Sequence, residues 1–112
     1  MILFKKRKTV ECEPKILFEI MQDDLKEGLC TFIDFKVNGE KHKLWSDGDN
    51  GETKSNVSFH LDKEEYDTFE ELKALAVLNN KNFYKSNLLV TVTECNGCYV
   101  ESTPRLAVLI KD

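Results

Sequence analysis

The spacing of apolar positions changes along the chain and marks where helices and strands are expected. Residues 14–27 carry an apolar stripe near helical spacing, made of Ile16, Leu17, Ile20, Met21 and Leu25. Pro14 suits a first helical turn, where its missing N–H costs nothing, and Gly28 suits a helix end. The pattern therefore predicts a first helix over residues 14–27.

A second helix is predicted from Thr68, where Thr-Phe-Glu-Glu fits a capping box. In such a box the Thr68 hydroxyl binds a free backbone N–H, and the carboxylate of Glu71 reaches back to another. Asn79-Asn80 is expected to end this helix. Its buried face is expected to consist of Phe69, Leu72, Leu75 and Ala76.

An Asn-Gly pair between two β-rich runs predicts a tight hairpin. Residues 29–37 and 40–45 flank Asn38-Gly39, which suits a type I′ turn because that turn needs positive φ at both central positions. A two-residue loop also fixes the register. The expected opposing pairs are Val37 with Glu40, Phe35 with His42, Asp34 with Lys43 as a favourable charge pair, and Ile33 with Leu44.

Polar residues 46–56 predict a loop, and alternation over residues 57–61 predicts a third strand. Val57, Phe59 and Leu61 are expected to point inward from that strand, and His60 to point away from them.

The C-terminal part predicts a second hairpin of the same kind. Residues 87–95 and 98–110 are expected to be strands joined by Asn96-Gly97. Pro104 cannot donate to a ladder, so it implies a bulge or an edge in the last strand. The apolar run 106–110 is expected to lie inside the sheet.

The element order α-β-β-β-α-β-β predicts an α+β fold, a mainly antiparallel sheet of about five strands with two helices. With 112 residues, the chain has the size of one ordinary domain, and residues 1–112 are expected to form a single domain.

Composition narrows the classes of function. The formal net charge of -4 argues against a general nucleic-acid binder, although the basic run at residues 5–8 leaves salt-sensitive nucleic-acid binding as an alternative. No apolar run approaches the roughly 20 residues that span a bilayer, and the basic run follows the first apolar residues, unlike a secretory signal. The chain is therefore expected to be cytoplasmic, with no membrane association.

The cysteines raise the question of a metal or redox site. Cys95 and Cys98 form a single CxxC around a turn, whereas a structural zinc site usually has two such pairs. A redox CxxC typically opens a helix, and none is expected here. We interpret the pair as flanking a hairpin tip. A zinc-stabilised adaptor or regulatory domain, with Cys12, Cys30, His42 or His60 completing the site, stays an alternative.

No catalytic or cofactor motif is present in the sequence. The acidic loop that begins at Asp47 resembles a calcium loop, but Gly51 falls at position 5 and not at 6, and Ser58 stands at position 12, where the closing glutamate is absent. We therefore expect a non-enzymatic protein with no cofactor. A small enzyme with a dispersed site near His42 or His60 stays an alternative.

Acidic side chains are densest over residues 62–71, where six of ten are Asp or Glu. Some of them complement the start of the second helix, and the others could form a negative surface for a basic partner. Trp45, which precedes the acidic loop, is a candidate anchor because Trp is enriched at binding hot spots. The candidate partner-binding residues are Trp45, Asp47, Asp49, Glu52, Glu64 and Glu65.

In its length, its paired hairpins, its stretch EEYDTFEELKAL and its lack of catalytic motifs, the chain resembles the small acidic α+β immunity proteins of bacterial polymorphic toxin systems, including contact-dependent growth inhibition. The resemblance implies stoichiometric binding of a cognate toxin domain. A nuclease-type toxin would be the expected basic partner, since its own substrate is a polyanion.

Overall fold

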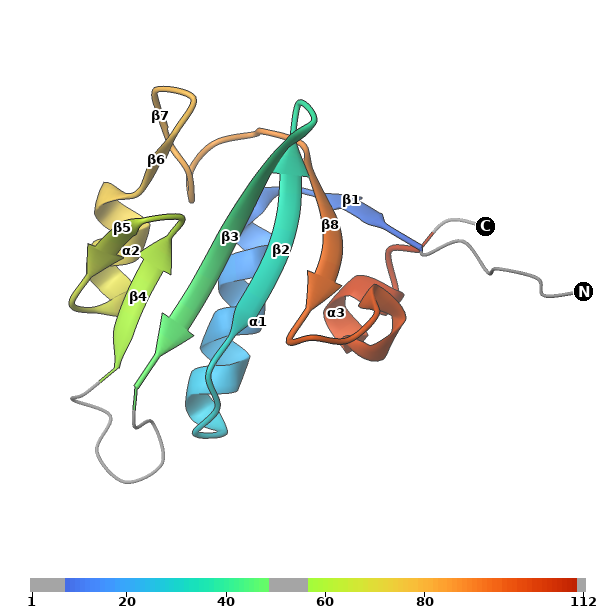
Figure 1. Cartoon of the computed structure of the whole chain (residues 1–112), viewed down its shortest axis with the longest axis horizontal. Coiled ribbons are helices and arrows are strands. Elements are labelled where there is room, and N and C mark those ends of the chain that lie inside the picture. Colours follow the sequence, from blue (N-terminus) through green and yellow to red (C-terminus); the bar gives the residue numbers. More distant parts are fainter. Residues whose placement is uncertain (1–7, 49–56, 111–112) are drawn as a thin grey trace, which may run out of the picture.

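The computed structural model describes residues 8–48 and 57–110. It has an α+β architecture with a mainly antiparallel sheet, which confirms the predicted class, but the numbers of strands and helices and their order differ from the prediction of about five strands and two helices (Figure 1). The main sheet has six strands in the order β1-β8-β2-β3-β4-β5, and all of its pairings are antiparallel. These strands are β1 (Val10–Cys12), β2 (Phe32–Val37), β3 (Glu40–Asp47), β4 (Ser58–Leu61), β5 (Glu64–Tyr66) and β8 (Val90–Cys95).

The remaining elements lie behind or beside this sheet. Helix α1 runs behind β2 and β3, α2 lies beside β4 and β5, and α3 lies next to β8 (Figure 1). A small second sheet pairs β6 with β7. The bounds are α1 (Pro14–Lys26), α2 (Phe69–Leu75), β6 (Val77–Leu78), β7 (Lys81–Asn82), the 3-10 helix η2 (Val100–Ser102) and α3 (Pro104–Ala107).

The first helix and the first hairpin confirm their predictions. Helix α1 begins at Pro14, and Gly28 just beyond its end has φ 73°. At the β2–β3 turn Asn38 has φ 51° and Gly39 has φ 83°, as a type I′ turn requires. All four expected cross-strand pairs occur, including Asp34 opposite Lys43.

The main sheet has one buried face and one open face, because side chains alternate along each strand. The α1 side carries the core residues of the central strands, among them Ile33, Phe35 and Leu44, all nearly inaccessible to solvent. Val57, Phe59 and Leu61, in and just before β4, were predicted to point inward. All three are buried, so this prediction is confirmed. The other face is not covered by a helix in Figure 1, and it carries the polar and aromatic residues of the same strands.

Aromatic side chains fill the space between α1 and the sheet. Phe83 stacks against Phe35 of β2, with ring centroids 5.4 Å apart, and packs at 5.9 Å against Phe18 of α1. All three rings are almost fully buried. The segment after β7 therefore supplies a central core residue, although the sequence pattern did not predict it.

The prediction of a strand over residues 98–110 is wrong. This segment forms η2 and α3, with Pro104 at the first position of α3. Pro104 therefore starts a helix and does not interrupt a strand. Leu106 is buried, but it is buried on a helix and not within the sheet. The place expected for the last strand is taken by β1, which pairs with β8.

The second helix is shorter than predicted. Its capping box is confirmed, since the Glu71 N–H donates to Thr68 Oγ1 at 3.0 Å and the Glu71 carboxylate accepts from a preceding backbone N–H. The helix ends at Leu75, and Asn79-Asn80 forms the β6–β7 turn with φ values of 53° and 64°. Leu72 and Ala76 are buried as expected, whereas Leu75 is 60% exposed.

Candidate functional site

A row of three rings crosses the open face of the main sheet. Trp45 of β3 lies between its cross-strand neighbours Phe32 of β2 and His60 of β4. The Trp45 and His60 rings stack with centroids 3.7 Å apart and planes at 6°, and the Phe32 centroid lies 6.0 Å from Trp45 on the other side. We call Phe32, Trp45 and His60 the aromatic row.

The aromatic row is held rigidly by its surroundings. The Trp45 indole Nε1–H donates to the carbonyl oxygen of Asp62 at 3.3 Å, which fixes the direction of the ring. The ammonium group of Lys43 lies 5.1 Å from the centre of the Phe32 ring. Trp45 remains half-buried and Phe32 is 39% exposed, so the row is ordered and still accessible.

An open depression of about 840 Å³ lies beside the aromatic row. Phe32 and Trp45 form part of its wall. The charged residues around it come from neighbouring strands and from the β4–β5 turn, and they are Asp34, Lys36, Lys41, Lys43, Asp62, Lys63 and Glu94.

His42 also reaches this depression, but its ring is engaged in the fold. Its Nδ1 lies 2.7 Å from Oδ2 of Asp62, and the ring stacks against Phe35 at 5.6 Å. The other oxygen of Asp62 accepts the backbone N–H of Lys43 at 2.9 Å. The His42 side chain is only 13% exposed. His42 therefore helps to fasten the β4–β5 turn onto β3.

Two further polar groups, the Ser58 hydroxyl and the Glu65 carboxylate, meet His60 at the edge of the aromatic row. Ser58 Oγ lies 2.9 Å from Nε2 of His60, and Oε1 of Glu65 lies 3.7 Å from the same nitrogen. A Ser-His-acid triad needs the carboxylate on the opposite ring nitrogen from the hydroxyl. Because both groups approach one nitrogen, the carboxylate does not orient His60 as a base for Ser58.

The structure brings three of the predicted partner-binding residues to one face. Trp45 and Asp47 are two positions apart on β3, and Glu65 is the cross-strand neighbour of His60, so all three lie on the open face. Glu64 pairs with Leu61 and is directed to the other side of β5. Asp49 and Glu52 lie outside the described residues.

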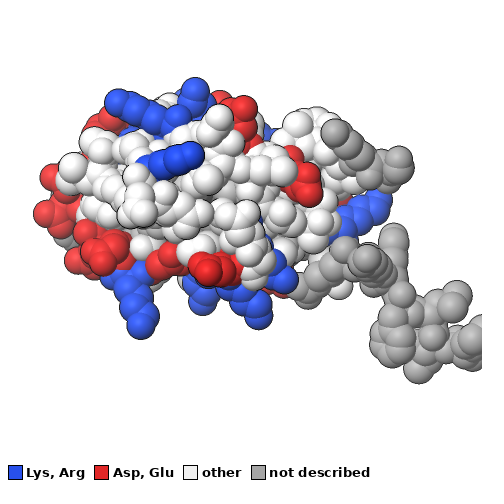
Figure 2. All heavy atoms as spheres, turned by 90° about the horizontal axis from the view of Figure 1, so that it is seen from above, with Lys and Arg blue, Asp and Glu red and all other residues white. Residues whose placement is uncertain are grey.

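Acidic side chains gather at the β5–α2 edge of the molecule. Glu64, Glu65, Asp67, Glu70 and Glu71 are all exposed. In Figure 2 acidic side chains mark the left margin, the side on which Figure 1 places β5 and α2. Elsewhere on the surface seen in Figure 2, basic and acidic side chains are interspersed around a largely uncharged area.

The cysteines do not assemble into a metal site among the described residues. Cys95 and Cys98 oppose each other across the Asn96-Gly97 turn, with φ 54° and 74° at the two turn positions, so the predicted turn is confirmed, although no second strand follows it. Within residues 8–48 and 57–110 no group of three or more His, Cys, Asp or Glu side chains is placed to hold a metal ion. The zinc alternative gains no support from this region.

Burial makes Cys95 and Cys98 chemically different. Cys98 is exposed, whereas Cys95 is buried, and burial raises the pKa of the Cys95 thiol.

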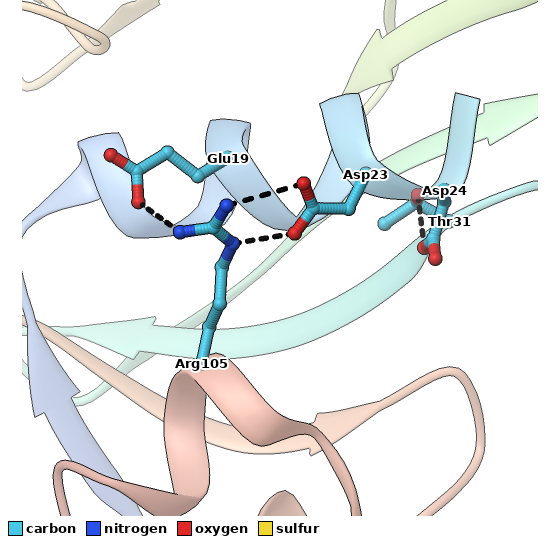
Figure 3. A network of polar contacts seen from close by, with 5 residues as sticks. All are labelled: Glu19, Asp23, Asp24, Thr31 and Arg105. Carbon is cyan, nitrogen blue, oxygen red and sulfur yellow. Dashed lines mark hydrogen bonds and ion pairs between the residues drawn. The ribbon is translucent and has the colours of Figure 1, made fainter. Parts of the chain in front are cut away.

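The C-terminal helical segment lies against this end of β8, and Arg105 of α3 fastens it to α1. The guanidinium binds both carboxylate oxygens of Asp23 and, at 3.0 Å, the carboxylate of Glu19 (Figure 3).

Phe32 is the main residue of the site that the sequence did not single out. It lies three positions before Phe35, on the opposite parity of β2 from the core residues. The signal that could have revealed it is an aromatic residue at a solvent-facing position of a strand. The register fixed by the turn places this residue directly opposite Trp45.

Comparisons of the chain with protein-family models, with curated proteins and with solved structures find no match. Among the helices of the described residues, none is long and apolar enough to cross a bilayer.

Proposed function

We propose that this chain is a non-enzymatic binding protein that neutralises a cognate toxin domain by stoichiometric binding in the cytoplasm. The proposed partner is a basic, nuclease-type bacterial toxin domain, as in the immunity proteins that the sequence resembles. The observation that carries the proposal is the aromatic row, which stands accessible and already ordered on an uncovered sheet face.

An ordered aromatic row favours protein binding for an energetic reason. Aromatic side chains that are already fixed lose little conformational freedom on association, so more of their burial contributes to affinity. Trp45 is fixed by its stacking on His60 and by the hydrogen bond to the Asp62 carbonyl. It therefore has the properties expected of a central binding anchor.

The acidic residues near the row supply the proposed charge complementarity. Asp47 and Glu65 share the open face with Trp45, and the exposed carboxylates of the β5–α2 edge continue from Glu65. A negative margin around an apolar anchor would attract a basic toxin and speed the encounter.

The arrangement of Ser58, His60 and Glu65 favours binding over catalysis. Their contacts converge on one imidazole nitrogen, and the His60 ring is packed against Trp45. This arrangement buries and orders His60 beside Trp45 without preparing a nucleophile.

The proposal is tested by a survival assay. The C-terminal domain encoded just upstream in the source genome is expressed in a test bacterium, alone, with the wild-type chain, and with the Glu65→Lys variant. We expect killing by the domain alone, rescue by the wild type and weakened rescue by the variant. If the domain is harmless, or if the wild-type chain gives no protection, the proposed function is wrong.

A further inference from the structure

Two cross-strand pairs on the open face place like charges directly opposite each other. Lys36 of β2 faces Lys41 of β3, and Asp34 of β2 faces Glu94 of β8. Like charges in such pairs destabilise a sheet, because the two side chains stand side by side. Departures from such local rules are expected at functional sites, where another requirement outweighs stability.

Of the two like-charge pairs, the Lys36–Lys41 pair has fewer oppositely charged cross-strand neighbours. Asp34 has Lys43 as its neighbour on the other side, whereas Lys36 has only the neutral Thr91 there. Within the described residues, no hydrogen bond or ion pair engages the ammonium group of Lys36 or of Lys41. Within the part of the chain that the structure describes, these two adjacent ammonium groups therefore form no direct ion pair with a carboxylate.

A third lysine extends this positive region. Lys63, in the β4–β5 turn, is exposed and lines the same depression as Lys36 and Lys41. We call Lys36, Lys41 and Lys63 the lysine end of the open face. Asp47 and Glu65 lie on the same face, and Trp45 comes between Lys41 and Asp47 along β3. Toward the β2–β3 turn the open face thus carries the three lysines with Asp34 and Glu94 beside them, whereas Glu65 is level with Trp45 and Asp47 lies beyond it.

The geometry favours a protein over a nucleic acid as the occupant of this face. Single-stranded nucleic acids bind by stacking bases on exposed aromatic planes. Here His60 covers one plane of Trp45 at 3.7 Å and Phe32 approaches the other, so the rings present mainly their edges.

We infer that the lysine end docks onto a cluster of carboxylates on the partner protein, while the aromatic row packs beside that cluster. This inference rests on the proposed function and specifies its interface. A basic nuclease has such a cluster where its carboxylates bind the catalytic divalent metal. Docking there would occupy the active centre, and Asp47 and Glu65 would lie over the basic residues that hold the polyanionic substrate.

The test uses Lys41→Glu, which turns the repulsive pair with Lys36 into an attractive one. We expect this variant to unfold at a temperature roughly 1 to 5 °C above the wild type. We also expect it to bind the domain from the survival assay at least about tenfold more weakly, because it brings a carboxylate against the partner's own carboxylates. Lys15→Glu, on an exposed position of α1, is the control with the same change in net charge.

The outcomes separate this inference from the proposed function. If the wild-type chain does not bind the domain, the proposed function fails and the inference with it. If the wild type binds and Lys41→Glu binds equally well, only the inference is wrong. Unchanged or lowered stability of Lys41→Glu would also overturn it, since the like-charge conflict would not exist. Tight binding of a labelled single-stranded oligonucleotide by the wild type, lost in Lys41→Glu, would assign the lysine end to nucleic acid instead.

Discussion

The indole of Trp45 lies flat against the imidazole of His60, with ring centroids 3.7 Å apart and planes 6° from parallel. His60 is buried by this contact although it belongs to the open face of the sheet. One side chain therefore serves as the rigid support of another, which remains half-exposed. This relationship makes Trp45 the residue on which the proposed interface depends most.

Replacement of Trp45 is expected to remove most of the affinity for the partner. We expect Trp45→Ala to raise the dissociation constant by roughly 30-fold or more, which corresponds to about 2 kcal/mol for a central hot-spot residue. Trp45→Phe keeps a ring in the row and should lose less. Titration calorimetry with the purified toxin domain measures both, with Val108→Ala, an exposed apolar truncation after α3, as control. Equal affinity of Trp45→Ala and wild type would exclude the aromatic row as the anchor.

Phe83 is expected to contribute strongly to stability. Its fully buried ring packs between Phe18 and Phe35, and truncation would leave a cavity between α1 and the sheet. Phe83→Ala should lower the free energy of unfolding by about 3–5 kcal/mol, and Phe83→Leu by clearly less. Denaturant titration followed by circular dichroism measures this. A loss below about 1 kcal/mol for the alanine variant would contradict the packing described here.

The cysteines should divide into two reactivity classes. Cys30 and Cys98 are exposed, whereas Cys12 and Cys95 are buried. Burial raises the pKa of Cys12 to about 11, with Glu13 adding to the effect, and burial also raises the pKa of Cys95. Because the thiolate is the reactive form, Cys30 and Cys98 should be alkylated quickly at pH 8 in the native protein. The two buried thiols should react only after unfolding, and mass spectrometry of the labelled peptides reads out each site. Rapid native labelling of Cys95 would show that the C-terminal helical segment does not cover it.

The stability that the ion pair between Arg105 of α3 and Asp23 of α1 contributes should depend on pH. Arg105 lowers the pKa of Asp23 below its ordinary value of 3.8, through a hydrogen bond to the carboxylate and through its charge. A lowered pKa means that the pair stabilises the fold at pH values above 3.8, and that this contribution is lost as the pH falls through the pKa of Asp23 in the folded protein.

Arg105→Ala should therefore unfold at a lower temperature than the wild type at pH 7. The difference should be modest, because both partners are about half exposed and the pair is screened by solvent. It should shrink toward zero in strong acid and in high salt. Thermal unfolding at several pH values tests this, and a difference that grows on acidification would contradict the assigned pair.

Local signals in the sequence were sufficient for the first hairpin, for the turn at Asn96-Gly97 and for the first helix. Asn-Gly at 38–39 and at 96–97 requires positive φ, and this requirement alone fixes the turn and the pairing next to it. The same register also places Lys36 opposite Lys41. The charge conflict of the open face therefore follows from the turn chemistry once the loop length is known.

The C-terminal region could not be predicted from local pattern alone. A short apolar run such as residues 106–110 fits a buried strand and a buried helical turn equally well. Pro104 likewise suits a strand interruption or a first helical turn, and the structure has the second. Strands β1 and β5 have three residues each, too few for an alternating pattern to stand out.

The sequence predicted only part of the candidate site, because no tight turn fixes the register between β3 and β4. Trp45 could be singled out by its residue type, and parity along β3 places it on the same face as Asp47, whereas the position of Glu65 depends on the pairing of β3 with β4 and of β4 with β5. The support that His60 gives to Trp45 depends on the pairing of β3 with β4, which are joined by a long polar connection and not by a tight turn. No local signal fixes that register.

The strand order has a consequence for how the chain acquires its fold during synthesis. Strand β8 lies between β1 and β2, so the strand of the main sheet that is synthesised last pairs with two strands that are synthesised much earlier. Until it arrives, β2 to β5 can pair in succession along the chain, but β1 has no neighbour and β2 has an unpaired edge. A nascent chain in which β8 has not yet been synthesised would therefore expose a sheet edge that can pair with other chains, so the pairing of β8 also protects the sheet from aggregation.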